Sequence, residues 1–377
     1  MRIAFDAKRA AQNRTGLGNY SRFVIRILQR YYPDDMQLLY VPNPRKTQYL
    51  GSDLTSSGRV SLRFPQGLWK RLRSLWRVWG VTADTKREGC DVFHGLSNEL
   101  PLNVRKAGCR KVVTIHDLIF IHCPEYYHWI DRKVYDFKFR RACRNADVVV
   151  AVSEYTKREI MRYYGTPEHK IRVVYQGCDP AFAATVPQEK ADEVRCRYQL
   201  PSRFVLYVGS IEKRKNLMVV AKAFAESREL QASGLKVVAV GKRTAYTDEI
   251  IRYLCAKGID NRFLFFHNVP FADLPSFYCS ATVFVYPSRI EGFGIPLLEA
   301  ITAGVPAIGC TGSCLEEAGG PDSIYVNPDD YHAMAQAIIR VANDPVQRKS
   351  MTDKGKAYAR RFSDETLARQ LHEIYIK

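Results

Sequence analysis

The sequence predicts two α/β domains, each a doubly wound parallel sheet with helices on both faces. Short runs rich in β-branched residues recur along the 377-residue chain, and nearly all end in a small or polar residue. Several, such as DVVVAVS and FVLYVGS, are almost continuously apolar, which is typical of parallel strands covered on both faces. Helical stretches separate most runs, and this alternation predicts doubly wound sheets. The runs form two sets, and the length suits two domains.

The predicted strands divide evenly between the halves of the chain. In the first half they are 2–7, 36–41, 91–95, 111–117, 147–153 and 171–177, and in the second 204–210, 235–241, 263–269, 282–288, 306–310 and 323–327. Helices are expected at 216–230 and 329–343, among others. The stretch 179–201 is rich in Ala, Pro and charge and has no strand pattern, so the domain boundary lies there. We therefore predict domains at 1–180 and 181–362.

The tail, residues 363–377, predicts one amphipathic helix. Ser363 can cap its first turn, and Asp364 and Glu365 suit the positive end of the helix dipole. Its apolar side chains share one face, namely Leu367, Leu371, Ile374 and Tyr375. This helix is therefore expected to pack on a domain.

The composition predicts a folded protein, and the net charge predicts an anionic partner. Hydrophobic residues make up 46% and charged residues 25% of the chain, and no apolar run approaches the roughly 18 residues that cross a bilayer. The start, MRIAFDAKRA, lacks the apolar core of a signal peptide, so we expect a cytoplasmic protein with reduced cysteines. A net charge of +18 favours nucleic acid, a membrane surface or phosphorylated substrates, without deciding among them.

The loop and helix start at 288–300, SRIEGFGIPLLEA, give the strongest functional signal. Open α/β sheets bind ligands at the carboxyl ends of their strands, and this segment follows the predicted strand TVFVYPS. Backbone amides of Phe293, Gly294 and Ile295, at a helix start near Pro296, offer a site for an anion or a hydroxyl. Glu299 can accept hydrogen bonds from a ribose diol, and Glu291 can meet a sugar ring. The alternative is an ordinary helix start with two solvated glutamates.

The segment 209–216, GSIEKRKN, gives the second signal. Gly209 and Ser210 leave the strand FVLYVGS, and Lys213, Arg214 and Lys215 follow at once. Fixed cations in this position could stabilise a departing nucleoside diphosphate. Positive charge at a helix start opposes the helix dipole, so a compensating anion is expected. A solvated charge run is the alternative.

Two weaker signals lie in the first domain. Gly16-Leu17-Gly18 opens a helix after the first strand, but the third glycine of a dinucleotide fingerprint is missing, so a phosphate-facing loop and a plain turn both remain open. His116 ends the strand KVVTIHD, where it could hydrogen-bond a sugar hydroxyl or be purely structural.

Residues 66–80, QGLWKRLRSLWRVWG, predict a basic amphipathic helix. Leu68, Leu72, Leu75, Trp76 and Trp79 lie roughly along one helical face, with Lys70, Arg71, Arg73 and Arg77 between them. Such a helix can bind an anionic membrane surface, which would place the protein peripherally at the inner face of the cytoplasmic membrane. The alternative is a core helix whose long cations reach out to solvent.

The motif E-x7-E within EGFGIPLLEA, preceded by KRKN and followed by AGVPAIG, resembles family 4 of the retaining glycosyltransferases. DVFHGLSNELP, TIHDL and ADVVVAVSEYTK resemble its acceptor-side domain, so the likeness covers nearly the whole chain. The branch looks like bacterial mannosyltransferases of surface-polysaccharide assembly, lipopolysaccharide included. The resemblance implies the GT-B fold, in which two Rossmann-like doubly wound domains face a cleft, with the donor on the second domain. It also implies that the last helix, 363–377, crosses back to the N-terminal domain.

The resemblance also implies roles for single residues. Glu291 would contact the donor sugar, Glu299 the ribose and Lys215 the diphosphate, while the residues of 293–295 would offer amides. His116 would line the reaction centre, and Gly16 and Gly18 the phosphate side of the cleft. Asn268 and Val269, with Phe271, would lie near the base. Many relatives carry an arginine where this chain has Ser210, and Arg214 would supply that charge here.

The resulting hypothesis is a hexosyltransferase that moves mannose, with retention, from a nucleotide diphosphate sugar to a glycan or lipid-linked glycan. GDP-mannose is preferred over a UDP-sugar on the branch resemblance alone. No DxD motif lies beside the donor loops, since Asp329-Asp330 looks like a helix start, so neither a metal site nor a further cofactor is expected. A nucleotide-sugar epimerase and a non-catalytic binder of anionic ligands are the alternatives. Nucleic acid is disfavoured because the basic residues are dispersed and no nucleic-acid motif occurs.

Overall fold

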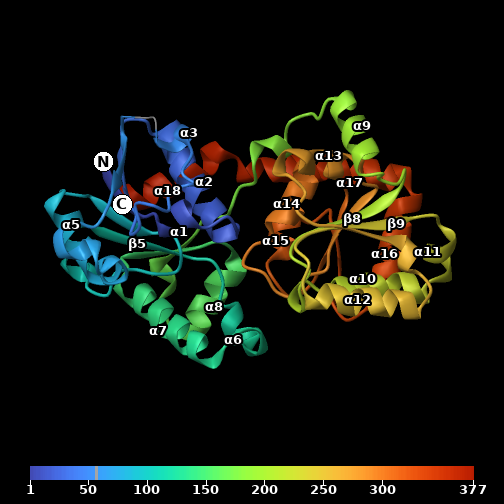
Figure 1. Ribbon diagram of the computed structural model, residues 1–377, viewed down its shortest axis with the longest axis horizontal. Helices are drawn as coiled ribbons and strands as arrows, with labels where there is room; N and C mark the ends of the chain where they lie inside the picture. The colour runs from blue at the N-terminus through green and yellow to red at the C-terminus, as the bar shows by residue number, and fades with distance from the viewer. Residues whose placement is uncertain (56–57) are drawn as a thin grey trace. The chain divides into compact units, whose positions relative to one another are not determined.

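The computed structural model describes residues 1–55 and 58–377, and the chain forms two compact units (Figure 1). Unit 1 comprises Met1–Gly177 and Phe362–Lys377, and unit 2 comprises Cys178–Arg361. The chain therefore leaves unit 1 once and returns to it with its last helix. The breaks lie near the boundaries expected from composition, at 180 and 362.

Unit 1 is built on a parallel sheet whose described strands run in the order β3-β2-β1-β4-β5-β6-β7. The strands are β1 (Arg2–Asp6), β2 (Met36–Tyr40), β3 (Val60–Arg63), β4 (Val92–Gly95), β5 (Arg110–Ile115), β6 (Val148–Ala151) and β7 (Ile171–Val173). The central strands are wholly or almost wholly buried, as their continuous apolar runs predict. Sequence reasoning missed β3, because VSLR at the sheet edge is short and only half buried.

Helices cover both faces of this sheet, with α2 and α18 on one side and α7 and α8 on the other (Figure 1). The described helices are α1 (Lys8–Gln12), α2 (Gly16–Tyr31), α3 (Ser52–Thr55), α4 (Arg73–Leu75), α5 (Val81–Arg87), α6 (Ile119–His122), α7 (Trp129–Asn145), α8 (Glu154–Tyr164) and α18 (Asp364–Ile376). Beneath α7, Phe139 and Cys143 pack on Val113 and Ile115 of β5. This core holds the carboxyl ends of the strands in a fixed arrangement.

The final helix docks on unit 1 through a buried polar chain. Ser363 caps α18 by accepting from the Thr366 amide, and the apolar face predicted for this helix is buried, which confirms that expectation. The Tyr375 hydroxyl lies 2.6 Å from Nδ1 of His94, and Nε2 of His94 lies 2.9 Å from Oγ1 of Thr114. Burial lowers the pKa of His94 to about 3, so its ring is neutral.

Within residues 178–361, all of which the structure describes, six parallel strands run in the order β10-β9-β8-β11-β12-β13. They are β8 (Phe204–Val208), β9 (Lys236–Val240), β10 (Phe263–Phe266), β11 (Val283–Tyr286), β12 (Ala307–Cys310) and β13 (Ile324–Val326). Every predicted strand of this half is present. Like the first six strands of unit 1, these follow the 3-2-1-4-5-6 order of Rossmann domains, so the predicted fold class is confirmed.

The helices of unit 2 are α9 (Gln188–Arg197), α10 (Leu217–Glu226), α11 (Arg228–Ala232), α12 (Ala245–Ala256), α13 (Leu274–Ser280), α14 (Ile295–Thr302), α15 (Leu315–Gly319), α16 (Tyr331–Asn343) and α17 (Pro345–Ala359). In Figure 1, α13, α14 and α17 lie on one side of the sheet and α10, α12 and α16 on the other. The single helix predicted at 216–230 is wrong, because Ser227 interrupts it. The Ser227 hydroxyl accepts from the Leu230 amide and so starts a new helix.

The segment 66–80 is not one helix, so the single apolar face predicted for it is wrong. It folds as a 3-10 turn at Gly67–Lys70, the short α4, and a π-helical turn at Trp76–Gly80. This irregular path turns Trp76 into the core, where its ring contacts Gly80 and its Nε1 donates to Asp84 at 2.7 Å. Leu68 and Trp79 remain exposed. Burial of the largest side chain overrides the uniform helical period.

No helix in the part of the chain that the structure describes has the length and apolar character needed to span a bilayer. None of the ten cysteines forms a disulfide.

Candidate active site

The two loops with the strongest sequence signals follow neighbouring strands of unit 2. β8 and β11 are adjacent in the sheet, and the strand order reverses between them. At such a switch point the connections after the two strands diverge and leave a crevice for ligands. Gly209 and Ser210 leave β8, with the Gly209 amide donating to Val240 O at 2.9 Å. The loop of Glu291 leaves β11, so Lys215 and Glu291 meet although 76 residues separate them.

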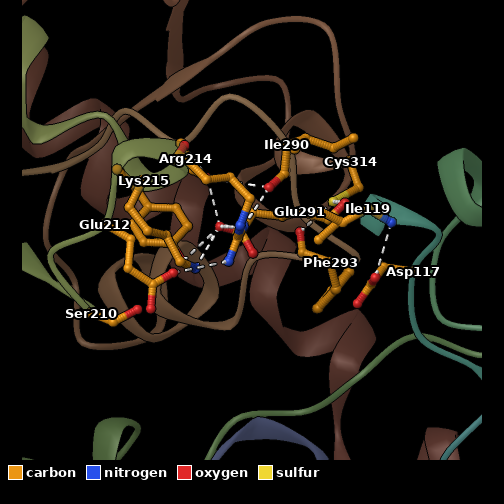
Figure 2. A network of polar contacts seen from close by, with 12 residues as sticks. Asp117, Ile119, Ser210, Glu212, Arg214, Lys215, Ile290, Glu291, Phe293 and Cys314 are labelled. Carbon is orange, nitrogen blue, oxygen red and sulfur yellow. Dashed lines mark hydrogen bonds and ion pairs between the residues drawn. The ribbon is translucent and has the colours of Figure 1, made fainter. Parts of the chain in front are cut away.

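Glu291 is the centre of a compact polar network (Figure 2). Its Oε1 lies 2.5 Å from the Lys215 ammonium and 2.9 Å from Nη1 of Arg214. The same oxygen accepts from the Ser288 hydroxyl at 2.6 Å and from the Tyr286 hydroxyl at 3.2 Å. Lys215 also donates to the Tyr286 hydroxyl. All these contacts fall on Oε1, and no protein donor within the described ranges reaches Oε2, which leaves that oxygen for a ligand.

The buried part of the network carries a net positive charge. Burial alone would raise the pKa of Glu291, but Lys215 and then Arg214 outweigh it and hold that pKa at about 2. Burial lowers the pKa of Lys215, with Glu291 opposing this effect and Arg214 adding to it. Side chains of Lys215 and Glu291 are each 11% exposed, so water screens the charges little. Arg214 also pairs with Glu212 at 4.0 Å, but that carboxylate is 48% exposed, so the buried part of the network sets two cations against one carboxylate and favours an anionic ligand.

The backbone around Glu291 is tied down by contacts that sequence reasoning missed. Nη1 of Arg214 donates to Ile290 O at 2.6 Å, and the Arg289 amide donates back to Arg214 O at 3.0 Å. The Sγ of buried Cys314 lies 3.1 Å from the carbonyl oxygens of both Glu291 and Phe293, so its single S–H is shared between them. Cys314 follows β12, the next strand of the sheet, and only this strand order could have drawn attention to it. Both cations and the carboxylate therefore sit on a fixed frame.

The helix that carries Glu299 begins as predicted. Gly294 caps α14 with φ of 111°, a conformation that side chains strongly disfavour, and a Cβ there would lie 2.7 Å from the Leu315 side chain. Pro296 lies in the first turn. The Phe293 carbonyl accepts from Cys314, whereas the amides of Gly294 and Ile295 donate to no acceptor in the described part of the protein. These two amides are the anion-binding end of the helix.

Glu299 lies one helical turn further on and is held by Tyr278. The Tyr278 hydroxyl donates to Oε2 at 2.8 Å. Burial raises the pKa of Glu299 to about 7 against the opposing effect of this hydrogen bond. Glu299 therefore titrates near neutrality, unlike Glu291.

The residues expected near the base lie away from the Glu291 network. Asn268 and Val269 follow β10, the edge strand of the sheet, and Asn268 is exposed with φ of 60°. Neither contacts Glu291. Phe271 is half exposed and packs edge-on against Phe182. Ser210 contributes its carbonyl, which accepts from the Tyr207 hydroxyl at 2.9 Å.

In unit 1, His116 and the Gly16–Gly18 helix start lie close together. Nε2 of His116 donates to Leu96 O at 2.9 Å, and its Nδ1 lies 3.3 Å from the Gln176 amide nitrogen. Burial lowers its pKa to about 4, so the ring is neutral. Tyr20 of α2 contacts this ring edge-on at 4.6 Å. A Cβ on Gly18 would lie 1.9 Å from Asn13 O, so this glycine permits a tight helix entry.

A second charged network, missed by sequence reasoning, occupies the switch point of unit 1 between β1 and β4. Asp6 ends β1 and pairs with Nη2 of Arg77 at 2.6 Å. Nη1 of Arg77 lies 2.8 Å from Glu99, and Lys138 of α7 lies 3.4 Å from the same carboxylate. Arg77 comes from the irregular segment 66–80, which explains why no local pattern signals this network. Nowhere in the described ranges do three or more His, Cys, Asp or Glu side chains form a group able to hold a metal ion.

The comparison with known sequences matches both halves of the chain. Residues 35–182 match glycosyltransferase family 4, and residues 195–358 match glycosyl transferases group 1. O-antigen chain mannosyltransferase B of Escherichia coli is 30% identical over 287 residues, which are 75% of this chain and 74% of that protein. O-antigen chain mannosyltransferase RfbU of Salmonella typhimurium is 25% identical over 62% of each chain.

Solved structures agree on the fold. HepE of Anabaena, crystallised with UDP and glucose, superposes with a TM-score of 0.75 at 19% identity, over 99% of this chain and 98% of that one. WaaG, a glycosyltransferase of lipopolysaccharide biosynthesis, superposes with a TM-score of 0.70 at 15% identity over 99% of each chain. The family matches favour glycosyl transfer over epimerisation or ligand binding alone. The chain belongs to the family 4 glycosyltransferases and has the GT-B fold.

Proposed function

We propose that the chain transfers a hexose from a nucleotide diphosphate sugar to a glycan or lipid-linked glycan during surface-polysaccharide synthesis, and that this hexose is mannose. The observation that carries the donor assignment is the pairing of Lys215 and Arg214 around Glu291 at the β8/β11 switch point. Cations fixed beside the carboxyl ends of strands suit a diphosphate, whose negative charge grows as the sugar leaves. The choice of mannose is supported by the O-antigen mannosyltransferases, which are more similar in sequence to this chain than the UDP-binding HepE is.

The contacts are consistent with the role that the proposal gives to each residue. Lys215 and Arg214 stabilise the departing diphosphate, with the amides of Gly294 and Ile295 as further donors. Glu291 keeps Oε1 on the cations and offers Oε2 to a hydroxyl of the donor sugar. Glu299 accepts from the ribose diol. With charge supplied by side chains, the reaction needs neither a divalent metal nor a cofactor.

The proposed reaction retains the anomeric configuration. The bond between the anomeric carbon and the diphosphate oxygen breaks, and the acceptor oxygen bonds to the same face of that carbon. The acceptor proton passes to the departing phosphate oxygen, so no enzyme nucleophile is required. His116, neutral and with both ring nitrogens engaged, lines the acceptor side and transfers no proton in this proposal.

Calorimetric titration with GDP, UDP, GDP-mannose and UDP-glucose, each with and without EDTA, tests the proposal. We expect GDP and GDP-mannose to bind, and EDTA to change neither affinity. Glu299→Ala should lower the affinity for GDP-mannose, because the ribose diol loses its hydrogen-bond acceptor. Glu316→Ala, an acidic residue near the start of α15, is the matched control. Binding of UDP-glucose alone would overturn the mannosyl assignment, and unchanged affinity in Glu299→Ala would overturn the ribose assignment.

The proposed location is the cytoplasm, with unit 1 at the inner face of the membrane. Leu68, Leu72, Leu75 and Trp79 are exposed near Lys70, Arg71 and Arg73, which supports contact with an anionic surface. Co-sedimentation of the full chain with phosphatidylglycerol vesicles at rising salt tests this location.

A further inference from the structure

Exposed apolar side chains are concentrated in one part of unit 1. Across the described residues, twelve large apolar side chains are exposed, and nine of them lie between residues 68 and 137. These nine are Leu68, Leu72, Leu75, Trp79, Tyr126, Trp129, Ile130, Val134 and Phe137. Scattered exposed apolar residues are normal, but a concentration of this kind marks a binding surface.

Four of these side chains line a groove along α7. Trp129, Ile130, Val134 and Phe137 are 65%, 50%, 42% and 57% exposed, and recur at helical spacing. They form one wall of a cavity of about 470 Å³, and Val78, Leu100 and Leu102 form the other. We call this cavity the α7 groove. Its size is that of a small-ligand site, and its lining is predominantly apolar.

The second wall is anchored to both neighbouring segments. The Leu102 amide donates to Val78 O at 2.9 Å. Nη2 of Arg141, from the last turns of α7, donates to Leu102 O, also at 2.9 Å. The groove is therefore a fixed feature of unit 1, and its exposed wall is not simply a loose surface helix.

Two lysines, Lys133 and Lys138, line the groove. Lys133 lines it, is exposed, and has no ion pair or hydrogen bond to any residue that the structure describes. α7 as a whole carries six basic residues and two acidic ones. Two copies of this basic surface would repel each other, whereas an anionic amphiphile would be attracted to it.

One end of the groove is the charged network at the β1/β4 switch point. Glu99 and Lys138 line the groove and also belong to the network of Asp6 and Arg77. Ligands of doubly wound sheets bind at such switch points. The groove therefore leads from a polar site at the sheet to an apolar channel along α7.

We propose that the α7 groove holds the hydrocarbon chain of the acceptor, so that the acceptor is a glycan linked to a lipid through an anionic phosphate. Lys133 faces the phosphate, and the sugar end lies toward the switch point of unit 1. This inference rests on the proposed function and narrows its acceptor class, since a water-soluble glycan has no use for an apolar channel.

Tryptophan fluorescence of the full chain provides the test. All four tryptophans, Trp69, Trp76, Trp79 and Trp129, lie in unit 1, so their emission reports on this region and not on the donor site. The probe is farnesyl phosphate below its micellar concentration, with farnesol and inorganic phosphate as separate arms. We expect a saturable change with farnesyl phosphate, a weaker one with farnesol, and none with phosphate.

Matched variants locate the binding. The double variant Ile130→Ser with Val134→Ser should bind farnesyl phosphate roughly tenfold or more weakly, because two apolar contacts with the hydrocarbon chain of the ligand are lost. Val346→Ser replaces a side chain that is 79% exposed on α17 of unit 2 and should change nothing. Lys133→Gln should weaken farnesyl phosphate but not farnesol, with the exposed Lys349→Gln as its control. Because these positions are exposed, the variants should keep the wild-type urea midpoint and GDP-mannose affinity.

Three outcomes would overturn the proposal. Equal farnesyl phosphate affinity in the double variant and in wild type would mean that the hydrocarbon chain binds outside the α7 groove. Binding to phosphatidylglycerol vesicles without binding of farnesyl phosphate would make the groove a bilayer-docking surface. A dimer in sedimentation that the double variant abolishes would make it a contact between copies. In each case intact GDP-mannose binding would leave the proposed donor function standing.

Discussion

The two switch points of the molecule share one strand order but carry different chemistry. In unit 2, Lys215, Arg214 and Glu291 come from loops directly after β8 and β11 and form a compact centre whose buried charges are net positive. In unit 1, Asp6 ends β1 and Glu99 follows β4, but their cations, Arg77 and Lys138, come from more distant segments. The unit 1 network opens into an apolar groove, whereas the loop of the unit 2 network leads into the start of α14, where the amides of Gly294 and Ile295 donate to no acceptor among the described residues.

This difference shows how one architecture serves two kinds of ligand. A donor site for a constant nucleotide diphosphate can be built from short local loops, because its ligand has fixed charge and size. A site for a larger, partly apolar acceptor needs side chains from several segments. The same strand order thus provides the location, and the segments that reach the switch point provide the specificity.

Removing Arg77 should have the largest effect and tests whether the unit 1 network is structural. The side chains of Arg77 and Asp6 are 13% and 8% exposed, so Arg77→Ala leaves Asp6 and Glu99 with poorly compensated charge. We expect the free energy of unfolding to fall by about 3–5 kcal/mol in urea titrations. Arg87→Ala breaks an ion pair whose arginine is 69% exposed and should cost about 0–1 kcal/mol. Equal losses in the two variants would contradict the contrast between a buried network and a surface pair.

Removing Lys215 should be the next largest effect and acts on the rate. Lys215→Ala should lower kcat roughly 100- to 1,000-fold, because a fixed donor to the departing diphosphate is lost. Lys213→Ala changes a neighbouring lysine that is 62% exposed, and it should leave kcat near the wild-type value. Steady-state kinetics with GDP-mannose and an unfolding curve for each variant separate a catalytic loss from a folding loss. A similar kcat in both variants would place the diphosphate away from the Glu291 network.

Much of the donor site could be predicted because its signals are local. Continuous apolar runs identified every strand of unit 2, and the loops after two of them held Lys215 and Glu291. The direct contact between these residues could not be predicted, because it depends on which strands are neighbours. The contact between Cys314 and the Glu291 loop could not be predicted for the same reason, because Cys314 follows a third strand, β12.

The unit 1 site was less predictable because tertiary packing overrides its local patterns. The period of 66–80 indicated one amphipathic helix, but burial of Trp76 breaks the segment into short turns and brings Arg77 to Asp6. The apolar residues of α7 carried no separate signal, because an exposed helical face and a buried one share the same spacing. Only the structure shows that Trp129 and Phe137 remain uncovered.

The smallest predicted effect sharpens the contrast between the two glutamates of unit 2. Burial raises the pKa of Glu299 to about 7, whereas Lys215 and Arg214 hold that of buried Glu291 at about 2. Only an ionised Glu299 accepts two hydrogen bonds from the ribose diol, so GDP-mannose affinity should fall roughly tenfold from about pH 8 to pH 6. Calorimetry across this range should show proton release on binding at pH 6. Glu299→Gln should bind weakly with a flat pH profile, and an equally steep profile in that variant would assign the titration to another group.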